Sequence, residues 1–175
     1  MGVTLTTVPV EEYLRTTYHP DREYVDGQLV ERNVGEHYHS LMQSLIGEVL
    51  SSRRRERRFR VFTEQRVQIN DEPRYRIPDI CVKRLPYHVT PILVLPDVVI
   101  EIVSPDDRAS DLLAKVGEYL RAGIPHIWVV DPYKRSVVEA DAGGIREVRG
   151  LVVETELTGA IDFGQLFEWL YEPAE

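Results

Sequence analysis

The sequence predicts an α/β fold in which a mixed β-sheet is flanked by helices and preceded by an N-terminal β-hairpin. Three observations support this prediction. Asp26-Gly27 separates two strand-like runs, as expected for a two-residue type I′ turn, which needs positive φ at both centres. Residues 36–57 carry apolar side chains at helical spacing. Two apolar runs, 97–103 and 126–131, flank a helical pattern, which is typical of strands joined by a crossover helix.

Length and composition predict one folded domain over residues 1–175. Of the 175 residues, 43% are hydrophobic, and no repeat, low-complexity tract or linker interrupts them. The N-terminus lacks a signal-peptide pattern, and no apolar run approaches the ~20 residues of a membrane span, so we expect a cytoplasmic protein without membrane contact. Cys81 is the single cysteine, which excludes an internal disulfide. The motifs of nucleotide-binding loops, dinucleotide-binding folds and serine hydrolases do not occur.

The elements of the N-terminal half follow from local signals. A short helix is expected around residues 11–14, after Pro9 in its first turn. The long helix at 36–57 has an apolar stripe made of Tyr38, Leu41, Met42, Leu45, Ile46, Val49 and Leu50. Alternation over 59–69 indicates a half-buried strand, and 75–84 is the next strand candidate.

The elements of the C-terminal half begin with 97–103, a continuous apolar run typical of a strand buried on both faces. Ser-Pro-Asp-Asp then opens a helix over about 107–122, which Gly123 ends. Asp106 and Asp107 are interpreted as caps of this helix. A buried strand, two weaker strands and a terminal helix complete the chain, at residues 126–131, 135–140, 145–156 and 162–170.

The candidate chemistry starts from Glu101, which interrupts the run Val-Val-Ile-Glu-Ile-Val. A buried carboxylate is costly unless it is paired, hydrogen-bonded or bound to a cation. Asp79 enters another apolar strand after a proline, in Ile-Pro-Asp-Ile. Two acids on neighbouring strands can converge on a hard cation such as Mg²⁺ or Mn²⁺. The alternative for Glu101 is a structural carboxylate that an arginine or backbone amides satisfy.

Lys115 is the third candidate. Leu112, Leu113, Val116 and Leu120 define the apolar face of its helix, and Lys115 lies at the border of that face, roughly 110° from the centre. From there a long side chain can reach towards a strand end while its stem packs on apolar surface. By itself, a lysine on a helix flank is ordinary.

These residues belong to a longer succession of motifs. I-P-D is followed by L-P-D-V-V-I-E-I-V-S-P, by D-x-x-x-K-x-x-x-Y, and by A-G-I and W-V-V-D. Upstream lie R-E-Y-V-D-G-Q-L-V and a histidine near the start of the long helix. In this order the motifs resemble the Uma-two family of putative restriction endonucleases, within the PD-(D/E)XK nuclease superfamily, over about residues 8 to 170. The resemblance implies a restriction-endonuclease-like core and divalent-metal phosphodiester hydrolysis.

Residue by residue, the resemblance implies that Asp79 and Glu101 are the two metal-binding acids. Lys115 matches a lysine that has moved onto the following helix. The sequence departs from the parent superfamily at Val103, two positions after the second acid, where a lysine is usual. Lys83 is a rival for the lysine role, because residues 79, 81 and 83 share one face of a strand.

Two further residues match the family in supporting positions. Glu23 matches an early acidic position and is a candidate third metal-binding or supporting carboxylate; its alternative is a hairpin surface residue. His39 precedes apolar residues at helical spacing and is a candidate to contact phosphate or orient a carboxylate; its alternative is a structural histidine on a helix flank. The pair His37-x-His39 has no further Cys or His ligands at zinc spacing.

The arginines between residues 53 and 60 are candidate nucleic-acid contacts, in particular Arg53, Arg54, Arg57 and Arg58. The alternative is a solvated helix C-terminus, where cations suit the helix dipole. The net charge of −8 argues against indiscriminate nucleic-acid binding.

We therefore expect an Mg²⁺- or Mn²⁺-dependent endonuclease acting on nucleic acid, with DNA as substrate and a homodimer by analogy with nucleases that cut both strands. The alternative is a nuclease-like fold with weak or lost catalysis that binds nucleic acid or protein. Convergence of Asp79 and Glu101, with the Lys115 amine within roughly 3–5 Å, would favour catalysis. If the two carboxylates point apart, or if either is locked in an ion pair with an arginine, the metal-site hypothesis fails.

Overall fold

The computed structural model describes residues 7–32, 36–70 and 73–173. Its four helices are α1 (Val10–Arg15), α2 (His37–Arg53), α3 (Ala109–Arg121) and α4 (Phe163–Leu170). Its strands are β1 (Arg22–Val25), β2 (Gln28–Glu31), β3 (Phe59–Thr63), β4 (Val67–Gln68), β5 (Tyr75–Arg76), β6 (Ile80–Arg84), β7 (Leu93–Val94), β8 (Val98–Ile102), β9 (His126–Asp131), β10 (Ser136–Asp141), β11 (Gly144–Glu147), β12 (Val152–Thr155) and β13 (Gly159–Asp162).

The central element is a six-stranded sheet with the order β11-β10-β9-β8-β6-β3. Its pairs are antiparallel except β8 and β9, which run parallel and are joined by α3. A parallel pair needs such a crossover, because both strands must start from the same edge of the sheet. The predicted mixed sheet flanked by helices is confirmed.

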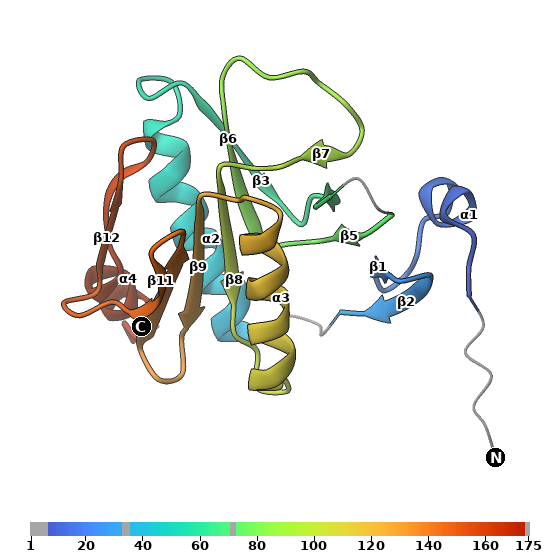
Figure 1. Cartoon of the computed structure of the whole chain (residues 1–175). Coiled ribbons are helices and arrows are strands. Elements are labelled where there is room, and N and C mark those ends of the chain that lie inside the picture. Colours follow the sequence, from blue (N-terminus) through green and yellow to red (C-terminus); the bar gives the residue numbers. More distant parts are fainter. Residues whose placement is uncertain (1–6, 33–35, 71–72, 174–175) are drawn as a thin grey trace.

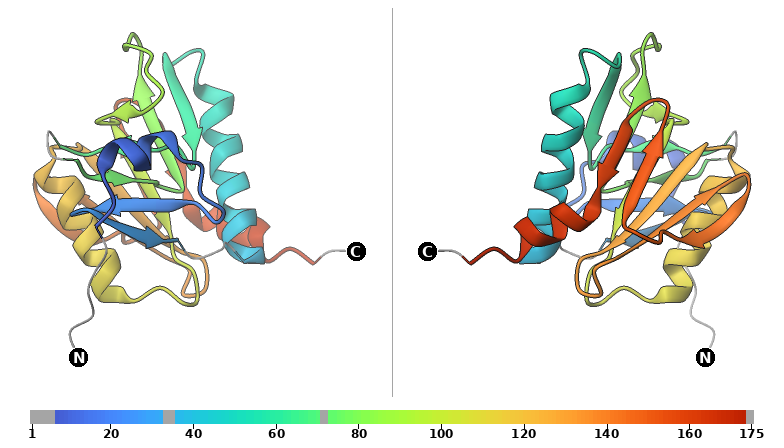
Figure 2. Two further views of the ribbon diagram at one scale, coloured as in Figure 1. Left: turned by 90° about the vertical axis from the view of Figure 1, so that its right-hand side faces the viewer. Right: turned by 90° about the vertical axis from the view of Figure 1, so that its left-hand side faces the viewer.

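Helices α2 and α3 lie on opposite faces of this sheet (Figures 1 and 2). Strand β8 is buried along its whole length and faces both layers in alternation. Ile100 packs with α2 and α4, whereas Val99 packs with α3. Glu101 is two residues after Val99, so its side chain lies on the same face of the sheet, towards α3.

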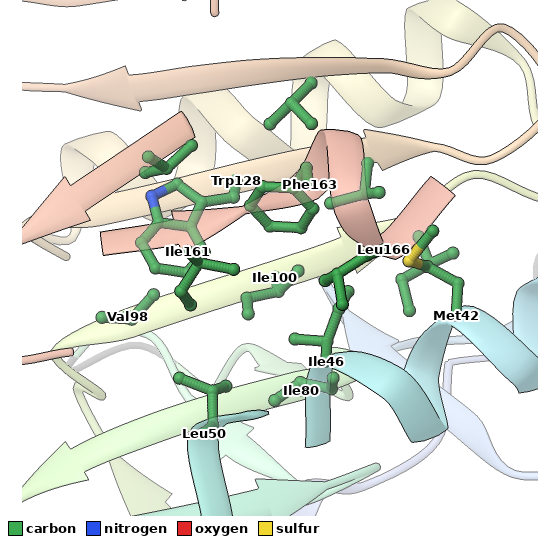
Figure 3. Close-up of a cluster of buried hydrophobic side chains, with 14 of the residues drawn as sticks. Met42, Ile46, Leu50, Ile80, Val98, Ile100, Trp128, Ile161, Phe163 and Leu166 are labelled. Carbon is green, nitrogen blue, oxygen red and sulfur yellow. The ribbon is translucent and has the colours of Figure 1, made fainter. Parts of the chain in front are cut away.

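The larger core lies between the sheet and helices α2 and α4. Figure 3 shows Met42, Ile46 and Leu50 pointing from α2 towards Ile80 and Ile100. These five side chains are fully buried. The predicted stripe of the long helix therefore faces the sheet, and it fixes the first turn of α2 beside the start of β6.

The predicted hairpin is confirmed. Asp26 and Gly27 have φ of 50° and 81°, as a type I′ turn requires. Strand β1 continues the pairing to β5, in a second, five-stranded sheet with the order β2-β1-β5-β4-β7. In Figure 1 this hairpin lies beside α3.

Several boundaries differ from the prediction. The expected strand 59–69 divides at Glu64, whose φ of 51° turns the chain from the six-stranded into the five-stranded sheet. The expected strand 75–84 divides around Pro78, which cannot donate to a ladder. The long helix ends at Arg53, four residues early, and 145–156 divides near Leu151, where φ is 58°. Alternating apolar residues do not reveal such breaks.

Among the described residues, no helix is both long and apolar enough to cross a membrane.

Candidate active site at the end of strands β6 and β8

Five predicted site residues come together around one cavity of about 470 Å³: Glu23, His39, Asp79, Glu101 and Lys115. They come from β1, the first turn of α2, the start of β6, the end of β8 and the middle of α3. Glu23, Asp79 and Glu101 are almost fully buried. Three carboxylates at one place require compensating cations or hydrogen bonds.

Asp79 is held by contacts to three elements. Its Oδ2 accepts a hydrogen bond from the Ile102 amide at 2.7 Å, which ties the start of β6 to the end of β8. His39 Nε2 lies 3.3 Å from the same oxygen. Arg32 Nη2 donates to Oδ1 at 2.7 Å. Burial opposes ionisation, but His39, Arg32 and the Ile102 amide together lower the pKa of Asp79 below its usual range.

Glu101 is fastened to α3 through both oxygens. Oε1 accepts the hydroxyl proton of Tyr119 at 2.6 Å, and Lys115 Nζ lies 3.4 Å from Oε2. Burial raises the pKa of Glu101 to about 7, and the charges of Asp79 and Glu23 add to this effect against the opposing charge of Lys115. Glu101 is therefore only partly ionised near neutral pH, and a bound cation would favour its charged form.

Lys115 is a buried cation between two acids. Its Nζ lies 3.1 Å from Glu23 Oε1, in addition to the Glu101 contact. Burial opposes the charge, but Glu101 and Glu23 outweigh it and raise the pKa of Lys115, which is therefore protonated. The predicted apolar face of its helix was partly wrong, because Leu113 is 56% exposed whereas Tyr119 is fully buried. Lys115 and Tyr119 are four residues apart, so they lie on the same face of α3, and both contact Glu101.

Glu23 is buried in the site, so the surface alternative for this residue is wrong. Arg76 Nη1 donates to Oε2 at 2.7 Å, and the Ile77 amide donates to Oε1 at 3.0 Å. Burial opposes ionisation, but the charges of Lys115 and Arg76 lower the pKa of Glu23. Glu23 therefore joins the hairpin, β5 and α3 at one carboxylate.

His39 points its Nε2 at Asp79, while its buried Nδ1 has no hydrogen-bond partner among the described residues. Burial lowers the pKa of His39, but the hydrogen bond to Asp79 and its charge raise it overall. The contact suits a residue that orients the Asp79 carboxylate.

The acids fit a divalent cation through a small donor set. Within the described part of the chain, no group of three or more His, Cys, Asp or Glu side chains is arranged to hold a metal. Mg²⁺ commonly binds through one or two carboxylates, with water and substrate phosphate completing its shell. Asp79 and Glu101 supply such a pair at one cavity. The Arg32 ion pair with Asp79, at 2.7 Å, is the arrangement expected to exclude a metal site, so a cation could bind Asp79 only where this pair is broken.

The arginine stretch does not reach this cavity. Arg53 donates to the carbonyls of Thr158 (3.2 Å) and Ala160 (2.5 Å), and Arg57 donates to Glu156 (3.1 Å). Both arginines hold the turn between β12 and β13. From the first turn of α2 to its end is about 21 Å, at 1.5 Å per residue, so the stretch and the cavity lie at opposite ends of this helix (Figure 1).

The rival lysine and the expected caps have other roles. Lys83 donates to the Leu95 carbonyl at 2.6 Å and lies 3.5 Å from Asp97, and it is not among the residues that line the cavity. Asp107 accepts the Ser104 amide at 2.7 Å, which closes the turn before α3. The N-cap residue of α3 is Arg108, and its side chain makes no capping hydrogen bond. The interpretation of Asp106 and Asp107 as caps was therefore wrong.

Sequence reasoning missed the cations that compensate the acids. Arg32 and Arg76 contact acids 47 and 53 residues away in the chain. Arg76 also pairs with Glu118 of α3 at 2.7 Å. A charged residue just before Ile-Pro-Asp was a signal for Arg76, because its neighbours favour burial. Arg32 follows a hairpin strand, and the sequence around it gives no signal that it would contact an acid.

The fold and the site together form a mixed sheet flanked by helices, with two acids at the ends of neighbouring strands and a lysine on the crossover helix. This is the arrangement that the resemblance to restriction-endonuclease-like nucleases implies. The model of the Uma2 family, described as "Putative restriction endonuclease", matches residues 10–157. The chain belongs to this family.

A solved structure supports this fold. A crystal structure described as that of a putative nuclease belonging to DUF820, from Anabaena variabilis, matches with a TM-score of 0.80 and 24% identity, over 93% of this chain and 99% of that chain. A structure described as a DrdV–DNA complex matches with a TM-score of 0.45 and 19% identity, over 81% of this chain and 12% of that chain. No curated protein matches the chain.

Proposed function

We propose that this chain is an Mg²⁺- or Mn²⁺-dependent endonuclease that hydrolyses phosphodiester bonds in DNA. The observation that carries the proposal is the meeting of Asp79, Glu101 and Lys115 at one cavity in a chain of this family. Such pairs of acids with a neighbouring cation suit phosphoryl chemistry, in which catalysis is mainly positioning and charge stabilisation.

In this proposal Asp79 and Glu101 hold the cation, which when bound polarises a phosphoryl oxygen and lowers the pKa of bound water. The Lys115 ammonium, 3.4 Å from Glu101, donates hydrogen bonds to the attacking water or to a phosphate oxygen as negative charge develops. Because it is protonated, Lys115 stabilises charge and does not accept the proton of water.

Glu23 and His39 act through these residues. Glu23 lies 3.1 Å from Lys115 Nζ and limits where this amine can point. His39 lies 3.3 Å from Asp79 Oδ2, opposite the side that Arg32 contacts, and orients the carboxylate. Their replacement is expected to weaken catalysis without abolishing it.

DNA binding beyond the cavity is proposed for the exposed arginines that follow α2. Arg54 and Arg58 are exposed, and no hydrogen bond or ion pair of their side chains is seen in the described part of the chain. They follow the end of α2, and the helix length from His39 to Arg53, about 21 Å, corresponds to roughly six base pairs at 3.4 Å each. Arg53 and Arg57 are less available, because backbone carbonyls occupy them. A homodimer would bring two sites to the two strands.

Cleavage of supercoiled and linear DNA with Mg²⁺, Mn²⁺ or EDTA tests the proposal. D79N and E101Q are expected to lose cleavage activity. K115M is expected to cleave at least about a hundredfold more slowly than the wild type. Exposed Glu154 supplies the matched control, E154Q, which is expected to cleave like the wild type. Cleavage that persists in both D79N and E101Q, or that is undiminished in EDTA, would contradict the assignment.

The Arg32–Asp79 ion pair favours a second candidate, a nuclease-like binding module without catalysis. Such a module would bind DNA with equal affinity in EDTA and in Mg²⁺, and D79N would bind as the wild type does. Fluorescence anisotropy with a labelled duplex, run beside the cleavage assay, separates the two candidates.

A further inference from the structure

Arg32 occupies one of the two carboxylate oxygens of Asp79, a residue that lines the cavity. Its Nη2 lies 2.7 Å from Asp79 Oδ1, and its side chain is 15% exposed. The Ile102 amide and His39 contact the other oxygen of Asp79. Arg32 itself lines the cavity. A metal cation that bound Asp79 through Oδ1 would therefore have to displace this guanidinium.

Each of the three buried acids of the cavity has a cationic side chain as a close partner. Glu23 pairs with Arg76 at 2.7 Å and Glu101 with Lys115 at 3.4 Å, and both cations come from the framework of the fold. Arg76 is anchored further by Glu118, at 2.7 Å.

Arg32 differs from these two cations. It follows the last residue of β2, outside any helix or strand, and Asp79 is its one ion-pair partner among the described residues. Of the three cations, Arg32 is thus the one held by a single carboxylate, whereas Arg76 and Lys115 each pair with two.

We propose that Arg32 and the divalent cation exchange on Asp79, and that the released guanidinium binds a phosphate of the DNA. This inference rests on the proposed function. A guanidinium and a divalent cation repel each other at one carboxylate oxygen, so metal binding displaces Arg32. The planar fork of arginine matches two phosphate oxygens, and substrate in the same cavity offers them. Arg32 is then a substrate-binding residue that also keeps Asp79 neutralised before the metal arrives.

Titration with Mn²⁺, followed by the electron paramagnetic resonance of the free ion, tests the exchange without reference to activity. R32Q is expected to bind Mn²⁺ about tenfold more tightly than the wild type, because the competing charged hydrogen bonds are gone. The matched control is R22Q, which removes an arginine of the same hairpin that pairs with Glu31 at 3.2 Å and not with the buried acids. R22Q is expected to stay within about twofold of the wild type. D79N is expected to lose the site.

A second measurement observes Arg32 itself. In ¹⁵N spectra of the guanidinium groups, the Arg32 signal, assigned by its loss in R32Q, is expected to shift when Mg²⁺ saturates the protein. Addition of a DNA duplex should then shift it again. If R32Q does not fold, R32K replaces it, because lysine keeps the positive charge but lacks the planar guanidinium fork. R32K is expected to bind Mn²⁺ about threefold more tightly than the wild type.

The outcomes separate the two claims. Equal Mn²⁺ affinity of the wild type and R32Q, or an Arg32 signal unmoved at Mg²⁺ saturation, would overturn the exchange and leave the metal site standing. Absence of Asp79-dependent Mn²⁺ binding in every variant would overturn the metal site, and with it the proposed function.

Discussion

Replacement of Glu23 by glutamine should destabilise the protein far more than the same replacement at Glu31 on the paired strand. The Glu23 carboxylate is 3% exposed and contacts Arg76 at 2.7 Å and Lys115 at 3.1 Å. Removing one partner of a buried ion pair leaves an uncompensated buried charge and costs about 3–5 kcal/mol. Glu31 pairs with Arg22 at 3.2 Å but is 59% exposed, and such surface pairs contribute about 0–1 kcal/mol.

The assay is urea unfolding followed by circular dichroism, at one pH and ionic strength for the wild type, E23Q and E31Q. A difference of several kcal/mol is a large part of the roughly 5–15 kcal/mol that stabilises a domain of this size. Equal midpoints for E23Q and E31Q would refute the burial of Glu23 among the cations. An unchanged m-value would show that the midpoints report stability rather than altered compactness.

Three further predictions concern the core and the titrating groups. Burial raises the pKa of the Cys81 thiol to about 12, so the thiol should not react with Ellman's reagent at pH 8 until urea unfolds the chain. The pKa of Glu101, near 4.5 when unfolded, is raised by burial to about 7, so its contribution to stability is fully present below pH 4.5 and is lost as pH rises through 7. In EDTA, the melting temperature should therefore fall less between pH 5 and 8 in E101Q than in the wild type. His39, whose pKa is raised by Asp79 against the effect of burial, titrates in both proteins and contributes equally to both. L113A should change the free energy of unfolding by less than about 0.5 kcal/mol, because this side chain is 56% exposed. L50A should lower the free energy of unfolding by about 2–5 kcal/mol, because Leu50 is fully buried. Equal losses of stability in the two variants would mean that α3 turns another face to the sheet.

The parts of the fold that could be predicted are those with a local cause. The type I′ turn follows from Asp26-Gly27, whose residue types tolerate positive φ. The strand buried on both faces follows from the run around Glu101, and the crossover helix from its Ser-Pro-Asp-Asp opening and Gly123, with φ of 83°. The break at Glu64 could not be predicted, because the same alternation continues on both sides while the chain changes sheets.

The candidate site divides in the same way. Asp79 and Glu101 stand out because a carboxylate among apolar neighbours demands a partner. Glu23 does not stand out, since a hairpin strand gives no sign of which face another element will cover. Arg32 and Arg76 depend wholly on tertiary contacts, and a single sequence does not show which cation meets which acid.

The most direct test of the metal site is a crystal structure with Mn²⁺, using anomalous scattering to locate the ion. We expect one peak between the carboxylates of Asp79 and Glu101, with oxygen–metal distances of about 2.0–2.3 Å and with Arg32 withdrawn from Asp79. A crystal saturated with Mn²⁺ that shows no peak there, and that keeps Arg32 on Asp79, would contradict this expectation.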